Sequence, residues 1–208
     1  MVRRRMLLEG ARTLAESGLS HGRTGNLSLR IEGGMLITPS GVPYHLLREA
    51  DLVELSLDGT PADPLARPSS EWAMHAAIYR HHPEAKAVVH CHSDHATALA
   101  CLRRGIPPFH YMVLQAGGPD IRCSDYATFG TGALSEAALR ALEGRRACLL
   151  ANHGQVTYGA TLALALELAE TVEHLARQYL LALQGGEPVL LDEQEMAQAR
   201  ERFGSYNR

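Results

Sequence analysis

The chain contains the run Ala87-Val88-Val89-His90-Cys91-His92, a β-branched apolar stretch that ends in two histidines. Such a run predicts a buried β-strand. Successive side chains of a strand point to opposite faces, so we expect His90 and His92 on one face and Cys91 on the other. Histidine is the commonest metal ligand, and the pair can form half of a metal site, although this pattern alone does not establish one.

Two further segments contribute candidate ligands. Residues 147–151 are a second apolar strand, which ends in Asn152-His153-Gly154. Ser69 and Ser70 follow a proline and precede a helical pattern to about residue 81, which is typical of an N-cap and places Glu71 in the first turn. There Glu71 is either a capping charge or a ligand. Three histidines with one open position are the pattern of a catalytic zinc site, in which Glu71 is either a fourth ligand or a base.

The remaining hydrophobic patterns predict both helices and strands. Helical spacing indicates helices over residues 5–17, 93–104, 132–142, 161–183 and 192–203, with a short helix at 44–50. Alternating or apolar runs indicate strands over residues 27–31, 35–37, 52–56 and 120–123, the first two joined by a hairpin. No linker or repeat interrupts the pattern, so we expect a single domain over residues 1–208, with residues 204–208 as a flexible tail.

Three segments offer backbone amides and hydroxyl groups: Gly25-Asn26, Ser40-Gly41 and Ser69-Ser70. A glycine-rich turn or a helix start can bind an anion. None of the three matches a P-loop, and each alone is equally consistent with a plain turn or helix start. Together they suggest a bound anion, and a phosphorylated sugar fits.

The composition of the 208 residues excludes several classes of function. The net charge of −3 provides no basic field for nucleic acid or an anionic membrane. No apolar run reaches the ~18 residues of a transmembrane helix. Glu9, Arg12 and Glu16 interrupt the apolar N-terminal stretch, unlike in a signal peptide. The four cysteines form no CxxC pair, so we expect free thiols and a cytoplasmic location.

One residue count bears on the chemistry. Lys86 is the only lysine among the 20 cationic side chains. It lies in the polar segment 83–86, where nothing indicates the burial that would lower its pKa. Iminium chemistry is therefore not expected, and a carbanion would need another source of stabilisation.

Eight stretches carry a more specific signal, in this order: residues 25–28 (GNLS), 35–41 (MLITPSG), 68–72 (PSSEW), 88–92 (VVHCH), 110–113 (HYMV), 116–118 (AGG), 126–130 (YATFG) and 152–154 (NHG). With these motifs the chain resembles the class II aldolase/adducin superfamily, most closely its L-fuculose-1-phosphate aldolase branch. The resemblance extends from about residue 7 to residue 206. It implies an α/β fold of three α/β/α layers, in which helices flank a central, mainly antiparallel sheet.

The resemblance also implies roles for individual residues. His90, His92 and His153 match the ligands of one Zn²⁺ per subunit. Glu71 matches a fourth ligand that serves as acid/base once substrate displaces it, which requires a pKa raised towards neutrality. Arg23 stands where the family usually has threonine, so we expect it either to strengthen phosphate binding or to alter substrate preference. The family's phosphate cradle corresponds to Gly25-Asn26, Ser40-Gly41 and Ser69-Ser70.

Two tyrosines complete the implied site. Tyr111 matches a proton donor that reaches a neighbouring subunit's site, and Tyr206 matches a tail residue that positions the aldehyde. The family forms homotetramers with active sites at subunit interfaces, so we expect the same here. The implied reaction is the reversible cleavage of a ketose such as L-fuculose 1-phosphate into dihydroxyacetone phosphate and a small 2-hydroxyaldehyde such as L-lactaldehyde, with Zn²⁺ stabilising the enediolate.

Two related activities and one non-enzymatic role remain as alternatives. An L-ribulose-5-phosphate 4-epimerase-like enzyme or a methylthioribulose-1-phosphate dehydratase-like enzyme would use the same three histidines. Tyr111 and residues 116–118 favour the aldolase branch. A non-catalytic interaction module like the adducin head needs no zinc site, and the chain keeps all three histidines and Glu71.

Overall fold

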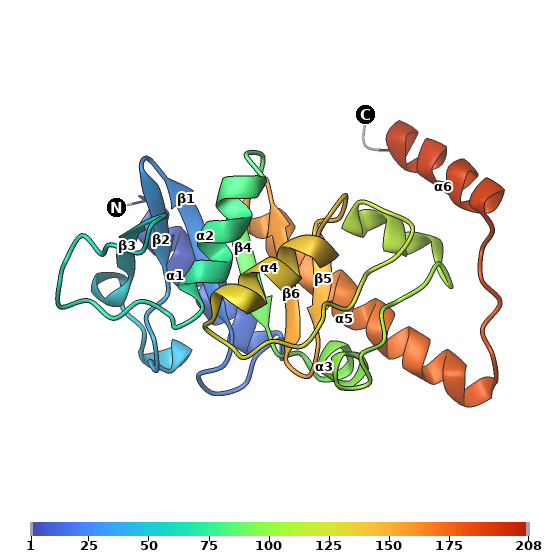
Figure 1. The fold of residues 1–208 in the computed structure, drawn as a ribbon, viewed down its shortest axis with the longest axis horizontal. Helices are drawn as coiled ribbons and strands as arrows, with labels where there is room; N and C mark the ends of the chain where they lie inside the picture. The colour runs from blue at the N-terminus through green and yellow to red at the C-terminus, as the bar shows by residue number, and fades with distance from the viewer. Residues whose placement is uncertain (1, 207–208) are drawn as a thin grey trace.

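A six-stranded sheet forms the centre of the computed structural model, which describes residues 2–206 and the side chains of residues 2–203 (Figure 1). The strand order is β3-β2-β1-β4-β6-β5, and each neighbouring pair is antiparallel. β4, the strand of the two histidines, is therefore paired along both edges. The strands are β1 (Asn26–Ile31), β2 (Gly34–Ile37), β3 (Val53–Ser56), β4 (Ala87–Cys91), β5 (Ala147–Leu150) and β6 (Gly154–Gly159).

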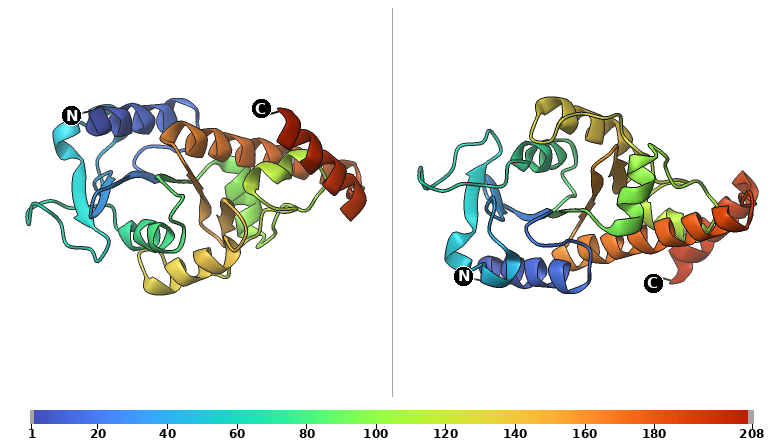
Figure 2. Two further views of the ribbon diagram at one scale, coloured as in Figure 1. Left: turned by 90° about the horizontal axis from the view of Figure 1, so that it is seen from above. Right: turned by 90° about the horizontal axis from the view of Figure 1, so that it is seen from below.

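Helices cover both faces of this sheet, as the two views of Figure 2 show. α1 (Val2–Glu16) and α5 (Leu162–Gly185) pack on one face, in a core that includes Val89 and Cys91 of β4. The other face carries α2 (Trp72–His81) and α4 (Gly132–Ala141), whose core includes Val88. Alternate residues of β4 thus enter opposite cores. The α/β/α layering and the antiparallel sheet implied by the resemblance are confirmed.

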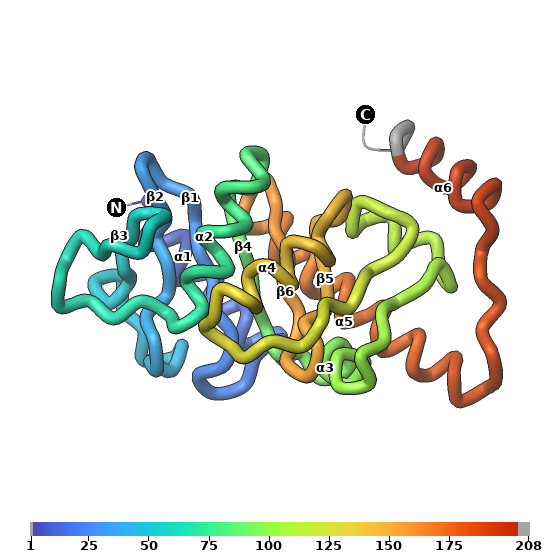
Figure 3. Tube along the Cα trace, viewed as in Figure 1, coloured from blue at the N-terminus to red at the C-terminus, as the bar shows by residue number. Residues whose placement is uncertain are grey.

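A third core cluster lies beside the β5 edge. α3 (Asp94–Cys101), the 3-10 helix η3 (Tyr111–Ala116) and part of α5 pack around Ala147 and Leu149. α6 (Glu193–Tyr206) follows α5 after an extended connection and contacts η3 at the outside of the molecule (Figure 3). It ends three residues later than predicted, because a glycine within a helix costs only about 1 kcal/mol. Within residues 2–206, no helix is long and apolar enough to cross a membrane.

The predicted helix over residues 44–50 is instead a pair of 3-10 helices. These are η1 (Tyr44–Leu46) and η2 (Glu49–Asp51). Leu47 between them has an extended backbone, and its side chain is buried in the core. Burial of this one side chain therefore interrupts the helical turn.

The predicted strand over residues 120–123 is also wrong. Ile121 bridges to Ile106, whereas Cys123 bridges to Leu149. Because the two residues bridge to different segments, each bridge stays isolated and no ladder forms.

Candidate metal centre

Strand pairing brings the three predicted histidines together at the carboxyl end of β4. His90 lies in β4 and His92 directly follows it, whereas Cys91 points into the opposite core, as predicted. His153 lies in the tight turn between β5 and β6, and β6 pairs with β4 so that Gln155 is opposite Cys91. The three imidazole rings are mutually edge-on, with centroids 4.8 Å apart in every pair.

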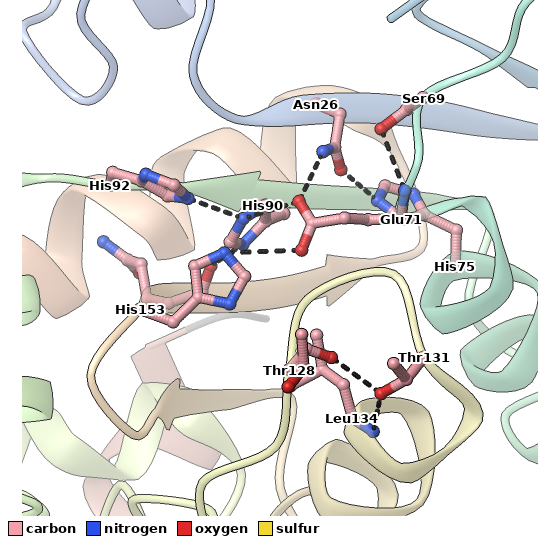
Figure 4. A network of polar contacts seen from close by, with 11 residues as sticks. Asn26, Ser69, Glu71, His75, His90, His92, Thr128, Thr131, Leu134 and His153 are labelled. Carbon is pink, nitrogen blue, oxygen red and sulfur yellow. Dashed lines mark hydrogen bonds and ion pairs between the residues drawn. The ribbon is translucent and has the colours of Figure 1, made fainter.

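The side chain of Glu71 is free to meet the histidines because it makes no hydrogen bond to the start of its own helix. It occupies the N-cap position of α2, just before Trp72, and its side chain makes no capping hydrogen bond. Glu71 Oε2 lies 3.1 Å from His90 Nε2, and Oε1 lies 3.3 Å from His153 Nε2 (Figure 4). The predicted serine N-cap is therefore wrong. Ser69 Oγ instead accepts a hydrogen bond from Glu71 N, which fixes the turn that precedes the helix.

The four side chains fit a metal ion. Their ligand atoms all lie within 4.8 Å of one another, and neighbouring ligand atoms are 2.9–3.3 Å apart. Four ligand atoms about 2.0–2.1 Å from a tetrahedral zinc ion are separated by about 3.3 Å, close to this spacing. Glu71 Oε1 is buried and has no hydrogen-bond partner among the described residues, as expected of an atom that faces a cation. Glu71 and the three histidines therefore form one candidate metal centre.

A hydrogen bond to the backbone orients His90. Its Nδ1 donates to the carbonyl oxygen of Gln155 at 2.8 Å, because a carbonyl can only accept. Nε2 therefore faces the cluster, an arrangement common among metal-binding histidines. Gln155 is itself fully buried and donates through Nε2 to Ser93 Oγ and to the carbonyl of Ala169. The support of this ligand thus extends into α5.

The electrostatics of the cluster favour an added positive charge. Burial, reinforced by His90, lowers the pKa of His92 to about 3 and that of His153 to about 4. Burial alone would raise the pKa of Glu71, but attraction to His90 and hydrogen bonding with it hold that pKa well below its usual range. The same pairing raises the pKa of His90 against the effect of burial. The lowered pKa of Glu71 suits the carboxylate as a metal ligand. The raised pKa that acid/base chemistry requires once substrate displaces Glu71 stays a prediction.

Backbone contacts hold two of the three predicted phosphate-binding turns together. Pro39 and Pro68 form an isolated bridge, and Ser69 N donates to the carbonyl of Thr38 at 3.1 Å. The Ser40-Gly41 turn and the Ser69-Ser70 turn therefore lie next to each other, directly before Glu71. Their role in phosphate binding stays a prediction.

The third turn reaches the same place from the start of β1. Gly25 has φ +76°, and an added Cβ would lie 2.7 Å from a carbonyl oxygen of β4, so only glycine allows this approach. The side chain of Asn26 faces the metal centre, where Nδ2 donates to Glu71 Oε2 at 2.9 Å (Figure 4). Arg23 Nη1 donates to the carbonyl of Gly41 at 3.4 Å and so links this turn to the second one.

Tyr111, one of the two predicted tyrosines, is not among the four side chains of the metal centre of its own chain. Tyr111 begins η3, is 48% exposed, and packs its ring on Phe203. It lines a groove of about 1060 Å³ together with Gly159, the last residue of β6. His153 precedes the first residue of β6, and a rise of about 3.4 Å per residue separates the two strand ends by about 17 Å. Tyr206 ends α6, and its side chain lies outside the described residues.

Sequence reasoning missed three polar residues that support the centre: His75, Ser28 and Gln155. His75 is fully buried, and its Nε2 lies 2.5 Å from Asn26 Oδ1. Its signal was the four-residue spacing from Glu71, which places both on one face of a helix. Ser28 and Gln155 carried no such signal, because their partners come from distant segments.

Comparison with known proteins finds one family and several similar aldolases. Residues 5–180 match the family model described as Class II Aldolase and Adducin N-terminal domain. The 5-methylthioribulose-1-phosphate/5-deoxyribulose-1-phosphate aldolase of Rhodospirillum rubrum is 50% identical over 200 residues, which cover 96% of this chain and 90% of that protein. The L-fuculose phosphate aldolase of Escherichia coli strain K12 is 43% identical over 203 residues, 97% of this chain and 94% of that protein. A solved structure of L-fuculose 1-phosphate aldolase matches with a TM-score of 0.92 and 40% identity, covering 97% of this chain and 96% of that one. The chain therefore belongs to the class II aldolase and adducin family.

Proposed function

We propose that the chain is a metal-dependent aldolase that reversibly cleaves a ketose 1-phosphate into dihydroxyacetone phosphate and a small aldehyde. The observation that supports this most is the position of Glu71, which shares one partly buried cluster with the three histidines and directly follows the Ser69 turn. A carboxylate between a metal site and anion-binding turns is suited to removing a proton next to a carbonyl. Lys86 offers no iminium alternative, because its Nζ is exposed and bonded to the Pro83 carbonyl.

His90, His92 and His153 would hold one metal ion per subunit, and nitrogen ligands in this number favour zinc. The ion would supply Lewis acidity at the substrate carbonyl. Glu71 is ionised while it faces the histidines. Once substrate oxygens separate it from them, burial becomes the dominant influence and raises its pKa, so the carboxylate can take a proton from C3 and return it.

The three turns would hold the phosphate group. Two of them are joined by the bridge between Pro39 and Pro68, and Arg23 reaches across from the third to Gly41. In this proposal Arg23 adds a positive charge to the cradle. The phosphate is remote from the bond that breaks, so its binding energy can orient the triose.

The aldehyde half of the site would come from a second copy of the chain. Tyr111 is half-exposed and packs on Phe203 beside the groove, outside the metal cluster of its own chain, which supports a role in another subunit. In a homotetramer Tyr111 would protonate the aldehyde oxygen in a neighbouring subunit, and Tyr206 would help to position the aldehyde. A cytoplasmic location, which fits the four free cysteines, stays a prediction.

The substrates named for the relatives suggest a shared class. L-Fuculose 1-phosphate, 5-deoxyribulose 1-phosphate and 5-methylthioribulose 1-phosphate all end in a methyl or methylthio group. Cleavage between C3 and C4 would release dihydroxyacetone phosphate from each, with lactaldehyde, acetaldehyde or methylthioacetaldehyde as the second product. We therefore propose terminally deoxy or methylthio ketose 1-phosphates as the substrate class, with L-fuculose 1-phosphate and 5-deoxyribulose 1-phosphate as the two leading members.

The test is a panel of phosphorylated ketoses and pentuloses assayed with the zinc-loaded protein. Release of dihydroxyacetone phosphate is measured by a coupled reductase, and epimers and dehydration products are resolved by chromatography. We expect triose phosphate from the deoxy and methylthio ketose 1-phosphates and little from ketose 5-phosphates. Epimer formation or loss of water without triose phosphate would contradict the proposal.

A further inference from the structure

A buried chain of hydrogen bonds leads to Glu71 from the core between β1 and α2. Tyr79 Oη lies 2.8 Å from Ser28 Oγ, which lies 2.7 Å from His75 Nδ1. On the other side of the ring, His75 Nε2 lies 2.5 Å from Asn26 Oδ1, and Asn26 Nδ2 donates to Glu71 Oε2 at 2.9 Å. All five side chains are buried, and His75 and Ser28 are fully so. Figure 4 shows the His75–Asn26–Glu71 part of this chain.

Only one direction of donation satisfies every member. The ionised carboxylate can only accept, so the Asn26 amide turns Nδ2 to Glu71 and Oδ1 to His75. His75 Nε2 must therefore carry a proton. Burial lowers the pKa of His75 to about 3, so the ring is neutral near pH 7 and Nδ1 is an acceptor. Ser28 then donates to Nδ1 and accepts from Tyr79.

We propose that His75 is a positioning residue for Glu71, which it controls through the orientation of the Asn26 side-chain amide. Without the Nε2–H donor, the amide could rotate by half a turn and place Oδ1 against the carboxylate, where two acceptors repel each other. The inference rests on the proposed function, because that function makes Glu71 the proton carrier. It extends that function to a residue that contacts neither metal nor substrate.

The first test measures the direction of the hydrogen bonds in the unaltered, zinc-loaded protein. Nitrogen–proton correlation spectra of histidine-labelled protein show which ring nitrogen carries the proton, with His75→Gln used to assign the signal. We expect His75 to be protonated on Nε2 and to stay neutral across the neutral pH range. A proton on Nδ1, or a ring that titrates there, would overturn the proposal.

The second test measures proton transfer alone. Exchange of the C3 hydrogen of dihydroxyacetone phosphate in deuterated water, followed by proton NMR, requires no aldehyde. His75→Phe replaces the imidazole by a phenyl ring and so removes the donor, and we expect exchange about 10- to 100-fold slower, the usual effect of losing a supporting residue of this kind. His75→Gln keeps an amide donor and should recover part of the rate.

Two controls separate positioning from general damage. Tyr79→Phe removes only the hydroxyl at the far end of the chain and should slow exchange less than His75→Phe. In a Glu71→Gln background, His75→Phe should cost little further activity, because the two changes act through one carboxylate. Unchanged exchange in folded, zinc-loaded His75→Phe, or full additivity in the double variant, would overturn the inference.

Failure of the inference differs from failure of the proposed function. If the unaltered protein does not exchange the C3 hydrogen, the assignment of Glu71 as proton carrier is contradicted. If the unaltered protein and both His75 variants exchange at the same rate, Glu71 keeps its role and only the role of His75 is lost. If His75→Phe does not fold, the spectra of the unaltered protein still show whether His75 donates to Asn26 through Nε2, as the inference requires.

Discussion

The two ends of β6 differ in how much of a site one chain supplies. At the start of β6, His153 belongs to a cluster of four ligand groups that β4, the β5–β6 turn and the start of α2 bring together. At the end of β6, Gly159 and Tyr111 line an open groove. The register between β4 and β6 fixes the residues at the start of β6, so those ligands meet without a contribution from another chain. Tyr111 is not part of that cluster, and in the proposed function it acts in the site of a second copy of the chain.

Removal of the metal should have the largest effect and should act at the His153 end. Treatment with EDTA is expected to abolish cleavage, and Zn²⁺ should restore it, because Glu71 alone cannot polarise a carbonyl. Metal content by atomic absorption and triose phosphate release are measured on the same samples. Full activity in a preparation shown to be free of metal would break the comparison, since the reaction would then not need the ligand cluster at the His153 end.

Glu71→Gln should come next. The three histidines should retain zinc, while turnover falls by about 10²–10⁴-fold, the usual contribution of an acid/base group. Glu84→Gln is the matched control, because Glu84 accepts a hydrogen bond from Tyr158 at the other end of β6. We expect the control to stay near the unaltered rate. Near-normal turnover in Glu71→Gln with full zinc content would refute its role.

Tyr111→Phe tests the open end. Zinc content and C3 hydrogen exchange should be unchanged, while aldehyde-forming cleavage falls by about 10²-fold, the lower range for a lost proton donor. Mixing refolded Tyr111→Phe and Glu71→Gln subunits should restore activity, because about a quarter of interface sites in random oligomers would then be intact. Activity no greater than the sum of the two variants would place Tyr111 in the site of its own chain, against the geometry.

The buried end should also respond to pH through His75. Its pKa of about 3 lies below the value of about 6.5 in an unfolded chain, so the unfolded state binds more protons below that pH. Stability from the neutral ring is therefore present above about pH 6.5 and is lost as pH falls, by up to about 1.4 kcal/mol per pH unit. Urea unfolding in EDTA at several pH values should show a flatter dependence for His75→Gln. Identical slopes would contradict the neutral buried ring.

Arg23→Gln should have the smallest effect. Its guanidinium is exposed, and an exposed ion pair contributes about 0.2–1 kcal/mol, so KM should rise by less than about fivefold with kcat unchanged. Added salt should narrow the difference between the two proteins, since exposed charges are screened. A changed kcat would show that Arg23 acts on the reacting bond rather than on the phosphate.

The ligand residues of the metal centre could largely be predicted from local patterns, whereas the pKa shifts of these residues could not. Alternation along residues 87–92 places His90 and His92 on one face, and the structure brings His153 to the same cluster. The serine N-cap was wrong, because the turn at Ser69 directs Glu71 away from its own helix. The lowered pKa of Glu71 in this arrangement could not be predicted either, since His90 and His153, which lower it, come from distant segments of the chain.

The sequence by itself determined most of the strands and helices and which strand face carries the histidines, because period and turn chemistry are local properties. Only the tertiary structure decided which of these residues meet. The pairing of β4 with β6 sets His153 beside His92, and the packing of α2 on β1 joins His75 to Asn26. Tyr111 instead packs on Phe203 of α6, beside the groove. Strand register and helix packing depend on contacts between distant segments, so no local pattern encodes them.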